Sequence, residues 1–214
     1  LVEAGGHRFV LDCGMHQGTR EDERRNREPF GFDINTIDAV VLSHAHIDHS
    51  GLLPLLVRRG FRGPIWTHPA TGRLMEIMLE DAANIAQMDA ERAKRFGHPD
   101  ARLGPLYDER DVQRTLKLVR DVEYATPRQV APGVTLTLHD AGHILGSAIV
   151  ELTEEGGDGQ RTLVFSGDLG MKDAPIVRDP QHPGHADRVI LESTYGDRDH
   201  RSRTDTETEF AEIL

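Results

Sequence analysis

Short apolar runs alternate along the chain with two longer segments of helical periodicity. Seven runs have the length of a buried strand, and they lie at residues 7–12, 38–42, 64–67, 134–138, 148–152, 162–165 and 189–191. Runs of this length, bounded by turn residues, are typical of strands. The glycine-rich segment 154–159 separates the fifth run from the sixth and predicts a turn, so we expect these two strands to form a hairpin.

Two segments predict helices with one apolar face. From residue 71 to 96, apolar residues recur at spacings of three and four, which is the period of an amphipathic helix. We expect its methionines to pack against the core; they are Met75, Met78 and Met88. A second helix is predicted over 108–120, with Val112, Leu116 and Val119 on one face. The charged segment 19–26 predicts a solvated loop or helical turn, and 205–214 predicts a last helix.

The order of these elements indicates the fold class. The strands fall into two clusters, and helices with one apolar face lie between them, which is typical of two packed sheets covered by helices. With 214 residues, the chain is long enough to bury one sizeable core. It begins at Leu1 rather than at a methionine and ends inside a predicted helix. We therefore expect it to be part of a longer protein.

Composition narrows the classes of function. No stretch approaches the roughly 18 consecutive apolar residues of a membrane span. The single cysteine, Cys13, excludes an internal disulfide framework and favours a reducing compartment, so we expect a cytoplasmic protein. The net charge of −11 does not favour nucleic acid, because phosphate contacts need lysine and arginine. A polyanionic substrate would have to be held by local positive charge, by bound metals or by protein outside this chain.

Four metal-ligand side chains lie within six positions, directly after the run at 38–42. They are His44, His46, Asp48 and His49. Residues two apart in an extended chain point the same way, so His44 and His46 can contact one cation. As the chain turns, Asp48 and His49 can reach a second one. These side chains are costly to bury unless something binds them, and imidazole with carboxylate suits zinc. The stretch predicts a metal site.

Three further polar residues follow predicted strands. A carboxylate such as Asp12 at a strand end commonly orients a metal-bound histidine; the alternative is a turn-forming aspartate. His143 lies between glycines, and Asp168 lies in a glycine turn. Alone, each of these two is also explained as a turn residue, but beside the first cluster the ligand interpretation gains weight. The remaining candidate histidines are expected in loops; they are His16, His68, His182, His185 and His200.

Four motifs together resemble one known family. They are His-x-His-x-Asp-His at 44–49, Gly-His-Ile-Leu-Gly-Ser at 142–147, Ser-Gly-Asp at 166–168 and Glu-Ser-Thr-Tyr-Gly-Asp-Arg at 192–198. In them the sequence resembles the metallo-β-lactamase fold, in the branch that carries a β-CASP domain and processes RNA. The first motif is shared by the whole superfamily. The last is narrower, and is similar to the cleavage and polyadenylation nuclease, the Integrator nuclease and their bacterial and archaeal relatives.

The resemblance implies a fold and a division into domains. The fold would be an α/β (α+β) four-layer αββα sandwich, incomplete because its first strand or strands would precede Leu1. Residues 1–198 would form the metallo-β-lactamase-type domain, and 199–214 would begin the inserted β-CASP domain. The rest of that domain, the last zinc ligand and the histidine that protonates the leaving group would lie outside this chain.

The resemblance also implies roles for the matching residues. Of two zinc ions, one would be held by His44, His46 and His143, the other by Asp48 and His49, with Asp168 bridging both. Asp12 would orient a ligating histidine, and Glu192 would orient a histidine of the β-CASP part. Asp48, Asp168 and Glu192 would serve catalysis. Arg198 is equally well a phosphate contact or a surface residue of a turn.

The leading hypothesis is a zinc-dependent ribonuclease. Two adjacent metals can lower the pKa of a shared water and clamp phosphate oxygens, so a metal-bound hydroxide would attack the phosphodiester bond. RNA, and single-stranded RNA in particular, is the favoured partner. A second hypothesis is a thioester or lactam hydrolase of the glyoxalase II type, which leaves 192–198 unexplained. A third is a non-catalytic partner that scaffolds an active nuclease. Endonuclease or exonuclease action and the oligomeric state stay open.

Overall fold

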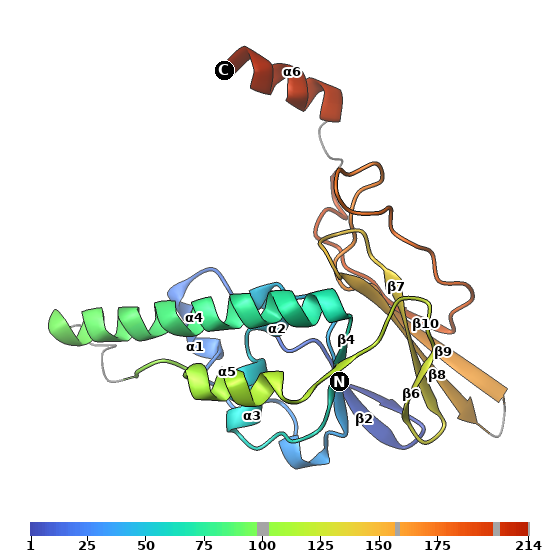
Figure 1. The fold of residues 1–214 in the computed structure, drawn as a ribbon, viewed down its shortest axis with the longest axis horizontal. Helices are drawn as coiled ribbons and strands as arrows, with labels where there is room; N and C mark the ends of the chain where they lie inside the picture. Colours follow the sequence, from blue (N-terminus) through green and yellow to red (C-terminus); the bar gives the residue numbers. More distant parts are fainter. Residues whose placement is uncertain (98–102, 157–158, 199–201, 214) are drawn as a thin grey trace.

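The computed structural model describes residues 1–97, 103–156, 159–198 and 202–213, and this part of the chain forms two five-stranded sheets (Figure 1). The first sheet consists, in spatial order, of β1 (Val2–Ala4), β2 (His7–Leu11), β3 (Ala39–Val41), β4 (Ile65–Thr67) and β5 (Val119–Asp121). Strands β2 to β5 are parallel, and β1 is antiparallel to β2. Parallel neighbours end at the same edge of the sheet, so the residues that follow β2 and β3 come together there.

The second sheet is mostly antiparallel. In spatial order it consists of β10 (Arg188–Ile190), β9 (Gly159–Phe165), β8 (Ala148–Gly156), β7 (Val134–Asp140) and β6 (Arg128–Ala131). Only β9 and β10 are parallel. The predicted hairpin is confirmed as β8 and β9, but both strands continue into the predicted turn, where Glu154 pairs with Arg161. Gly157 and Asp158, in the middle of that turn, lie outside the described residues.

Alternation along the strands divides the apolar residues between two cores. In β3, Val40 packs against the helices, whereas Ala39 and Val41 pack against the second sheet. From β7, the fully buried residues of the core between the sheets are Val134, Leu136 and Leu138. Successive side chains of a strand point to opposite faces, so the first sheet is covered on both sides. The prediction of two packed sheets is confirmed, and in the described part helices cover the first of them.

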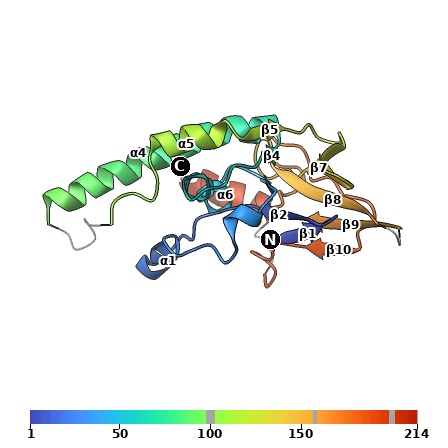
Figure 2. The same cartoon turned by 90° about the horizontal axis from the view of Figure 1, so that it is seen from below.

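One layer of helices covers the first sheet. Its members are α2 (Ile47–Ser50), α3 (Leu53–Arg58), α4 (Pro69–Arg95) and α5 (Glu109–Leu116). Figures 1 and 2 show α4 and α5 side by side on the same face. Both begin at a capping side chain: His68 accepts the Ala70 N–H, and Asp108 accepts the Asp111 N–H. Such caps satisfy donors that the first turn of a helix leaves free.

Two short helical segments lie between β2 and β3. They are α1 (Arg20–Arg25) and a 3₁₀ turn, η1 (Ile34–Thr36). Helix α1 confirms the helical-turn interpretation of residues 19–26. Thr19 and Asp22 form a reciprocal capping box at its start, which satisfies two backbone donors and explains why so charged a segment is helical.

The second predicted helix is shorter than predicted, because its last residues form a strand. Helix α5 ends at Leu116, and Val119 lies in β5, paired with Ile65 of β4. Val119 stands at helical spacing from Val112 and Leu116, so periodicity alone did not separate helix from strand. Pairing with β4 satisfies the backbone groups of this segment instead. Strands β1 and β6 were not predicted from the sequence either.

The long predicted helix is confirmed as α4, but only its first half packs against the core. Met75 and Leu79 are fully buried, whereas Ile85 and Met88 are 52% and 69% exposed. Figure 1 shows α4 running on past the sheets. The prediction that Met88 packs against the core is therefore wrong. An amphipathic pattern defines an apolar face, but it does not say what covers that face.

The end of the chain is helical as predicted. Helix α6 (Arg203–Ile213) stands apart from both sheets (Figure 1), and Leu214 lies outside the described residues. On the outer face of the second sheet, Ile149 and Val164 pack with Ala186 of an irregular segment. The described part therefore contains one helical layer and both sheets of the expected sandwich. None of its helices has the length and apolar content needed to cross a membrane.

Candidate metal centre

The candidate site residues meet at one edge of the two sheets. Asp12 follows β2, His44 follows β3, His143 follows β7, Asp168 follows β9 and Glu192 follows β10. Strand directions place the ends of β7, β9 and β10 on one side of the second sheet. The Ala148 N–H donates to the Ser43 carbonyl oxygen over 2.9 Å. This bond ties the start of β8 to the end of β3 and brings the two edges together.

Three histidines and one aspartate form a compact group. His46 Nδ1 lies 3.1 Å from His44 Nε2 and 3.2 Å from His143 Nε2. Asp168 Oδ2 lies 3.7 Å from His44 Nε2 and 3.6 Å from His143 Nε2. Ligand atoms of all four residues lie within 4.8 Å of one another. A cation among them would reach three imidazoles and a carboxylate, a set of donors that suits zinc.

His49 and Asp48 lie beside this group, on the other oxygen of Asp168. His49 Nε2 is 3.2 Å from Asp168 Oδ1 and 3.8 Å from Asp48 Oδ2. The Asp48 side chain is 52% exposed, so it lies at the mouth of the site. Asp168 presents one oxygen to each group, which is the arrangement of a carboxylate that can bridge two cations.

Asp12 lies behind the histidines, and both of its carboxylate oxygens have hydrogen-bond partners. Its Oδ1 accepts the Ser43 N–H over 2.7 Å, and its Oδ2 accepts the Ser43 hydroxyl over 2.7 Å and lies 2.7 Å from His49 Nδ1. Its φ of 56° is in the left-handed region, a costly conformation that is found at functional sites. Asp12, His44 and His49 also have ligand atoms within 4.8 Å. Because both oxygens of Asp12 have partners, its geometry is that of a residue that orients His49.

Glycines let the ligand loops of the second sheet approach other backbone closely. Gly142, next to His143, has a φ of 64°, and a Cβ there would lie 2.5 Å from the Arg178 carbonyl oxygen. A Cβ on Gly170 would collide with the Gly142 carbonyl oxygen. Ser147 Oγ accepts the His143 N–H over 3.0 Å. Glycine is required here because the chain combines a left-handed turn with a close contact.

Burial keeps the first histidines neutral. Burial and the neighbouring histidines lower the pKa of His44 to about 2, because a protonated ring there would lose hydration beside other cations. Burial and His143 also lower the pKa of His46. Burial opposes protonation of His49 as well, but the hydrogen bond and charge of Asp12 outweigh it and raise the pKa of His49. Metals bind unprotonated ring nitrogens, so His44 and His46 are prepared for a cation at neutral pH.

Glu192 supports the loop that carries Asp168. Its Oε1 accepts the Leu169 N–H over 2.6 Å, and its own N–H donates to Ser166 Oγ over 3.0 Å. These bonds fix the chain on both sides of Asp168. The role implied by the resemblance, orientation of a histidine in the β-CASP part, concerns residues outside this chain and stays a prediction.

Arg198 lies on an exposed turn that follows Glu192. Its Nε is 3.1 Å from Asp197 Oδ1, and its guanidinium carbon lies 5.9 Å from the centre of the Tyr195 ring. The side chain is 66% exposed. Both interpretations of Arg198, a phosphate contact and a surface residue of a turn, fit this position.

The other candidate histidines lie outside both groups of candidate ligands. His68 stacks on Tyr124 with ring centres 4.0 Å apart, and burial lowers its pKa. His16 is exposed, and its backbone pairs with the Asn26 side chain. In the segment before β10, the exposed histidines are His182 and His185, and His200 lies outside the described residues.

Ser43 is a site residue that sequence reasoning missed. It is fully buried, its hydroxyl donates to Asp12, and its Oγ lies 3.0 Å from His44 Nδ1. The one signal in the sequence is its place, since it directly precedes the ligand motif at the end of a buried strand. A buried polar residue there needs partners, and the sequence does not show which.

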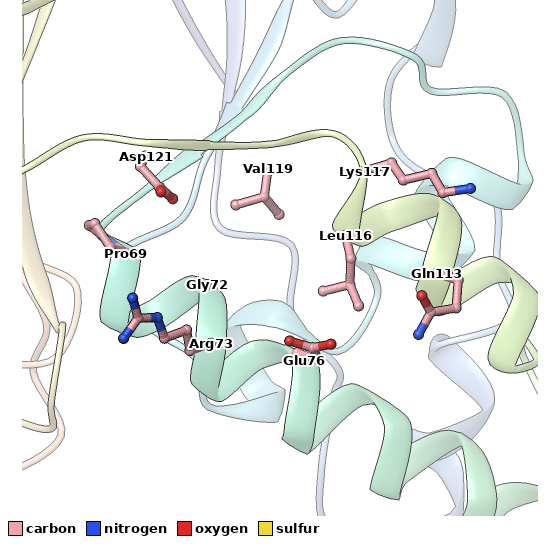
Figure 3. Close-up of a pocket in the computed structure, with 9 residues that line it drawn as sticks. All are labelled: Pro69, Gly72, Arg73, Glu76, Gln113, Leu116, Lys117, Val119 and Asp121. Carbon is pink, nitrogen blue, oxygen red and sulfur yellow. The ribbon is translucent and has the colours of Figure 1, made fainter.

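A separate hollow lies between the start of α4 and the end of α5 (Figure 3). Its volume is about 330 Å³, and its charged lining residues are Arg73, Glu76, Lys117 and Asp121. Acidic and basic side chains balance there, so the hollow is not an anion pocket of the kind that a phosphate needs. It contains none of the clustered ligands and gives no support for a second site.

Several known proteins are similar to this chain in sequence over most of its length. Ribonuclease TTHA0252 of Thermus thermophilus is 45% identical over 214 residues, 100% of this chain and 44% of that protein. Transcription termination factor FttA of Methanosarcina mazei is 34% identical over 206 residues, 92% of this chain and 29% of that protein. A Cronobacter sakazakii metallo-β-lactamase structure has a TM-score of 0.48 at 20% identity, over 82% of this chain and 57% of that one. The chain spans less than half the length of these two curated relatives.

A family comparison covers nearly the whole chain. The sequence model of the metallo-beta-lactamase superfamily matches residues 1–197. The matched segment holds both groups of candidate ligands, Asp12 and Glu192. Together with the two packed sheets, this match establishes the fold as a metallo-β-lactamase sandwich. The chain therefore belongs to the metallo-β-lactamase superfamily.

Proposed function

We propose that this chain is the metal-binding part of a ribonuclease that hydrolyses phosphodiester bonds of RNA in a two-zinc site. The observation that carries the proposal is the convergence of three histidines and Asp168 where the two sheets meet. Membership of the metallo-β-lactamase superfamily supports a metal-dependent hydrolase. A relative that is named a ribonuclease matches along the whole chain, which supports RNA as the substrate.

The proposed ligands follow the two groups of side chains. One zinc would be held by His44, His46 and His143 and the other by Asp48 and His49, with Asp168 between them. The residues fit zinc, because His44 is neutral and Asp168 turns an oxygen toward each group. When bound, two zinc ions lower the pKa of a water and neutralise charge on a phosphate.

Residues of the chain would hold this site in position for the reaction. Asp12 orients His49 through a 2.7 Å hydrogen bond. Glu192 holds the loop of Asp168 through the Leu169 N–H. Asp48 lies at the exposed mouth, where a phosphate would enter. Arg198, on the turn after Glu192, is available to pair with a phosphate of the RNA backbone.

The proposal includes parts that lie beyond this chain. Its net charge of −11 makes other contacts necessary for a polyanion, because acidic side chains outnumber lysine and arginine by 36 to 25 and phosphate contacts need cations. By the resemblance, residues 199–214 would begin a β-CASP domain, and that domain would supply the last ligand, the general acid and further contacts to single-stranded RNA. A cytoplasmic location is likewise a prediction.

A metal count and a cleavage assay on the full-length gene product test the proposal. We expect elemental analysis to find about two zinc ions per chain, and cleavage of a labelled single-stranded RNA that a chelator abolishes and zinc restores. A folded protein that binds no transition metal would contradict the proposal. So would cleavage that a chelator leaves unchanged.

Further substrates in the same assay separate the alternative functions. A glutathione thioester and a β-lactam test for a hydrolase of the glyoxalase II or lactamase type. We expect RNA to be cleaved and both small molecules to remain intact. Turnover of either small molecule with intact RNA would favour the other hydrolase. A zinc-bound protein that cleaves none of the three would favour the scaffold.

A further inference from the structure

Ser43 lies at the centre of the metal site without belonging to the proposed ligands. It is fully buried and lies two residues after the end of β3. Its hydroxyl donates to Asp12 Oδ2 over 2.7 Å, and the same Oγ lies 3.0 Å from His44 Nδ1. Its backbone N–H donates to Asp12 Oδ1 over 2.7 Å. One serine thus stands between the orienting carboxylate and a ligand of the first group.

Ser43 also touches the segments that carry the ligands of the second sheet. Its carbonyl oxygen accepts the Ala148 N–H over 2.9 Å, just after the loop that holds His143. A Cβ on Gly167 would lie 2.8 Å from Ser43 Cβ and 2.8 Å from Ser43 Oγ, so the turn before Asp168 packs directly against this side chain. Its rotamer is therefore confined from both sheets.

The chemistry of these groups decides which atom donates each hydrogen in the series of hydrogen bonds from His49 through Asp12 and Ser43 to His44. An ionised carboxylate only accepts hydrogen bonds, so Asp12 Oδ2 receives one hydrogen from Ser43 Oγ and one from His49 Nδ1. A serine hydroxyl has a single hydrogen and two acceptor lone pairs. Once that hydrogen points to Asp12, the hydrogen between Ser43 and His44 has to come from His44 Nδ1.

This order of hydrogens leaves the Nε2 atom of both rings free. A neutral imidazole carries its hydrogen on one nitrogen, so His44 Nε2 is an acceptor, and it faces His46 and Asp168 at 3.1 and 3.7 Å. His49 Nε2 is likewise free and faces Asp168 at 3.2 Å. In the opposite order Ser43 would donate to His44. An N–H would then point among the ligand atoms, and no hydrogen would lie between Ser43 and Asp12.

We propose that Ser43 is a positioning residue that transmits the orienting effect of Asp12 to His44. Asp12 sets the tautomer of His49 directly and that of His44 through Ser43. One carboxylate thereby prepares a ligand in each of the two groups, and the buried serine couples them. This inference rests on the proposed two-zinc site and deepens it, because it explains how ligands of both metals acquire a free Nε2.

The tautomer of His44 tests this relay of hydrogen bonds, from Asp12 through Ser43 to His44, directly. Histidine ring nitrogens are labelled with nitrogen-15 in the metal-free, full-length protein, and nitrogen NMR separates protonated from unprotonated ring nitrogens. The signals of His44 are assigned by their loss in His44→Asn. We expect a hydrogen on Nδ1 in the wild type and a mixture of tautomers in Ser43→Ala. A hydrogen on Nε2 in the wild type, or an unchanged Nδ1–H in Ser43→Ala, would overturn the proposal.

Zinc affinity gives an independent measure. We expect competition with a chelator to show a loss of about 10- to 100-fold in Ser43→Ala, as for other residues that orient ligands, and recovery in Ser43→Thr, which retains a hydroxyl. Ser50→Ala is the matched control, because Ser50 is also fully buried but donates to the carbonyl oxygens of Ala45 and His46. A Ser43→Ala affinity within about threefold of the wild type would reduce Ser43 to a space-filling residue.

A further variant keeps the test valid if Ser43→Ala fails to fold. In Asp12→Asn, the relay predicts that His44 loses its fixed tautomer together with His49, although Asp12 bonds to His44 only through Ser43. An effect confined to His49 would refute the relay. A wild-type protein that binds no zinc would contradict the proposed function. The His44 tautomer in the metal-free protein would still show whether Ser43 has the proposed positioning role.

Discussion

The two sheets hold their proposed metal ligands by different means. Those of the first sheet lie within 44–49, directly after a buried strand, and Asp12 supports this segment from behind by accepting the Ser43 N–H and contacting His49 Nδ1. Those of the second sheet, His143 and Asp168, sit on separate turns whose glycines approach other backbone closely. The halves also differ in how side chains support them: Asp12 contacts the ring of His49 directly, whereas Ser147 and Glu192 accept the backbone N–H groups of His143 and Leu169. Different substitutions should therefore damage the two halves.

His46→Ala should have the largest effect, because this residue connects the halves. Its Nδ1 lies 3.1 Å from Nε2 of His44 and 3.2 Å from Nε2 of His143. We expect the zinc content to fall from about two per chain to about one, since a three-histidine site loses a ligand. Elemental analysis measures this, with His185→Ala, a change at an exposed histidine, as the control. Unchanged zinc in His46→Ala would refute the ligand assignment.

Gly142→Ala should damage the second half by a steric route. The left-handed φ of 64° alone costs a non-glycine residue about 1–3 kcal/mol, and the added Cβ would also meet the Arg178 carbonyl oxygen at 2.5 Å. We therefore expect a lower Tm and weaker zinc binding, because the loop of His143 has to move.

Gly97→Ala is the matched control for that prediction. Gly97 has a similar φ of 67°, but no atom of the described residues lies within 4 Å of a Cβ added there. It should lose stability through backbone strain alone and keep its zinc affinity. Equal losses of Tm in the two variants, with equal zinc affinity, would show that close packing around Gly142 does not position His143.

Acidification should release the two metals in order, with a smaller effect than either substitution. The pKa of His49 is raised, chiefly because Asp12 outweighs the effect of burial, whereas burial lowers the pKa values of His44 and His46. As the pH falls, His49 is protonated first and its Nε2 can no longer bind a cation. Zinc of the second group should leave at a higher pH than zinc of the first. Metal content after dialysis at pH values from about 8 to 5 measures the order, and simultaneous release would contradict it.

The same contrast explains what the sequence revealed about the site. His44 to His49 form one contiguous motif at a strand end, so local geometry alone predicted a metal site. His143 and Asp168 are isolated residues in glycine turns, so they gained weight as ligands only beside the motif, and the resemblance then implied their roles. Ser43 was missed because its role depends on contacts with Asp12 and Gly167 that tertiary structure creates.

The fold shows a similar division between local and distant causes. Periodicity predicted α4 and the hairpin of β8 and β9, because their patterns lie within one segment. It failed at Val119, where a neighbouring strand rather than the helical pattern decides the conformation. It also failed at Met88, because burial depends on what covers a face. Short strands such as β1 carry too few residues to show a period, and pairing with a neighbour defines them.

Glu192→Gln should have the smallest effect on the metals and still reduce cleavage. Glu192 Oε1 accepts the Leu169 N–H over 2.6 Å, and a glutamine oxygen can accept the same bond without the charge that strengthens it. We expect zinc content to stay at the wild-type value and RNA cleavage by the full-length protein to fall by about tenfold, on the scale of one charge-assisted hydrogen bond.

Glu192→Ala extends this prediction, because it removes the acceptor altogether. The loop of Asp168 would then lose a bond on one side, so zinc affinity should fall as well as cleavage. A graded series, from wild type to Glu192→Gln to Glu192→Ala, would show that Glu192 acts on the metals only through the loop. Release of zinc already in Glu192→Gln would instead make Glu192 a ligand. In that case the second sheet would contribute a second carboxylate beside Asp168 to the metals, and Glu192 would act on them directly rather than through the loop.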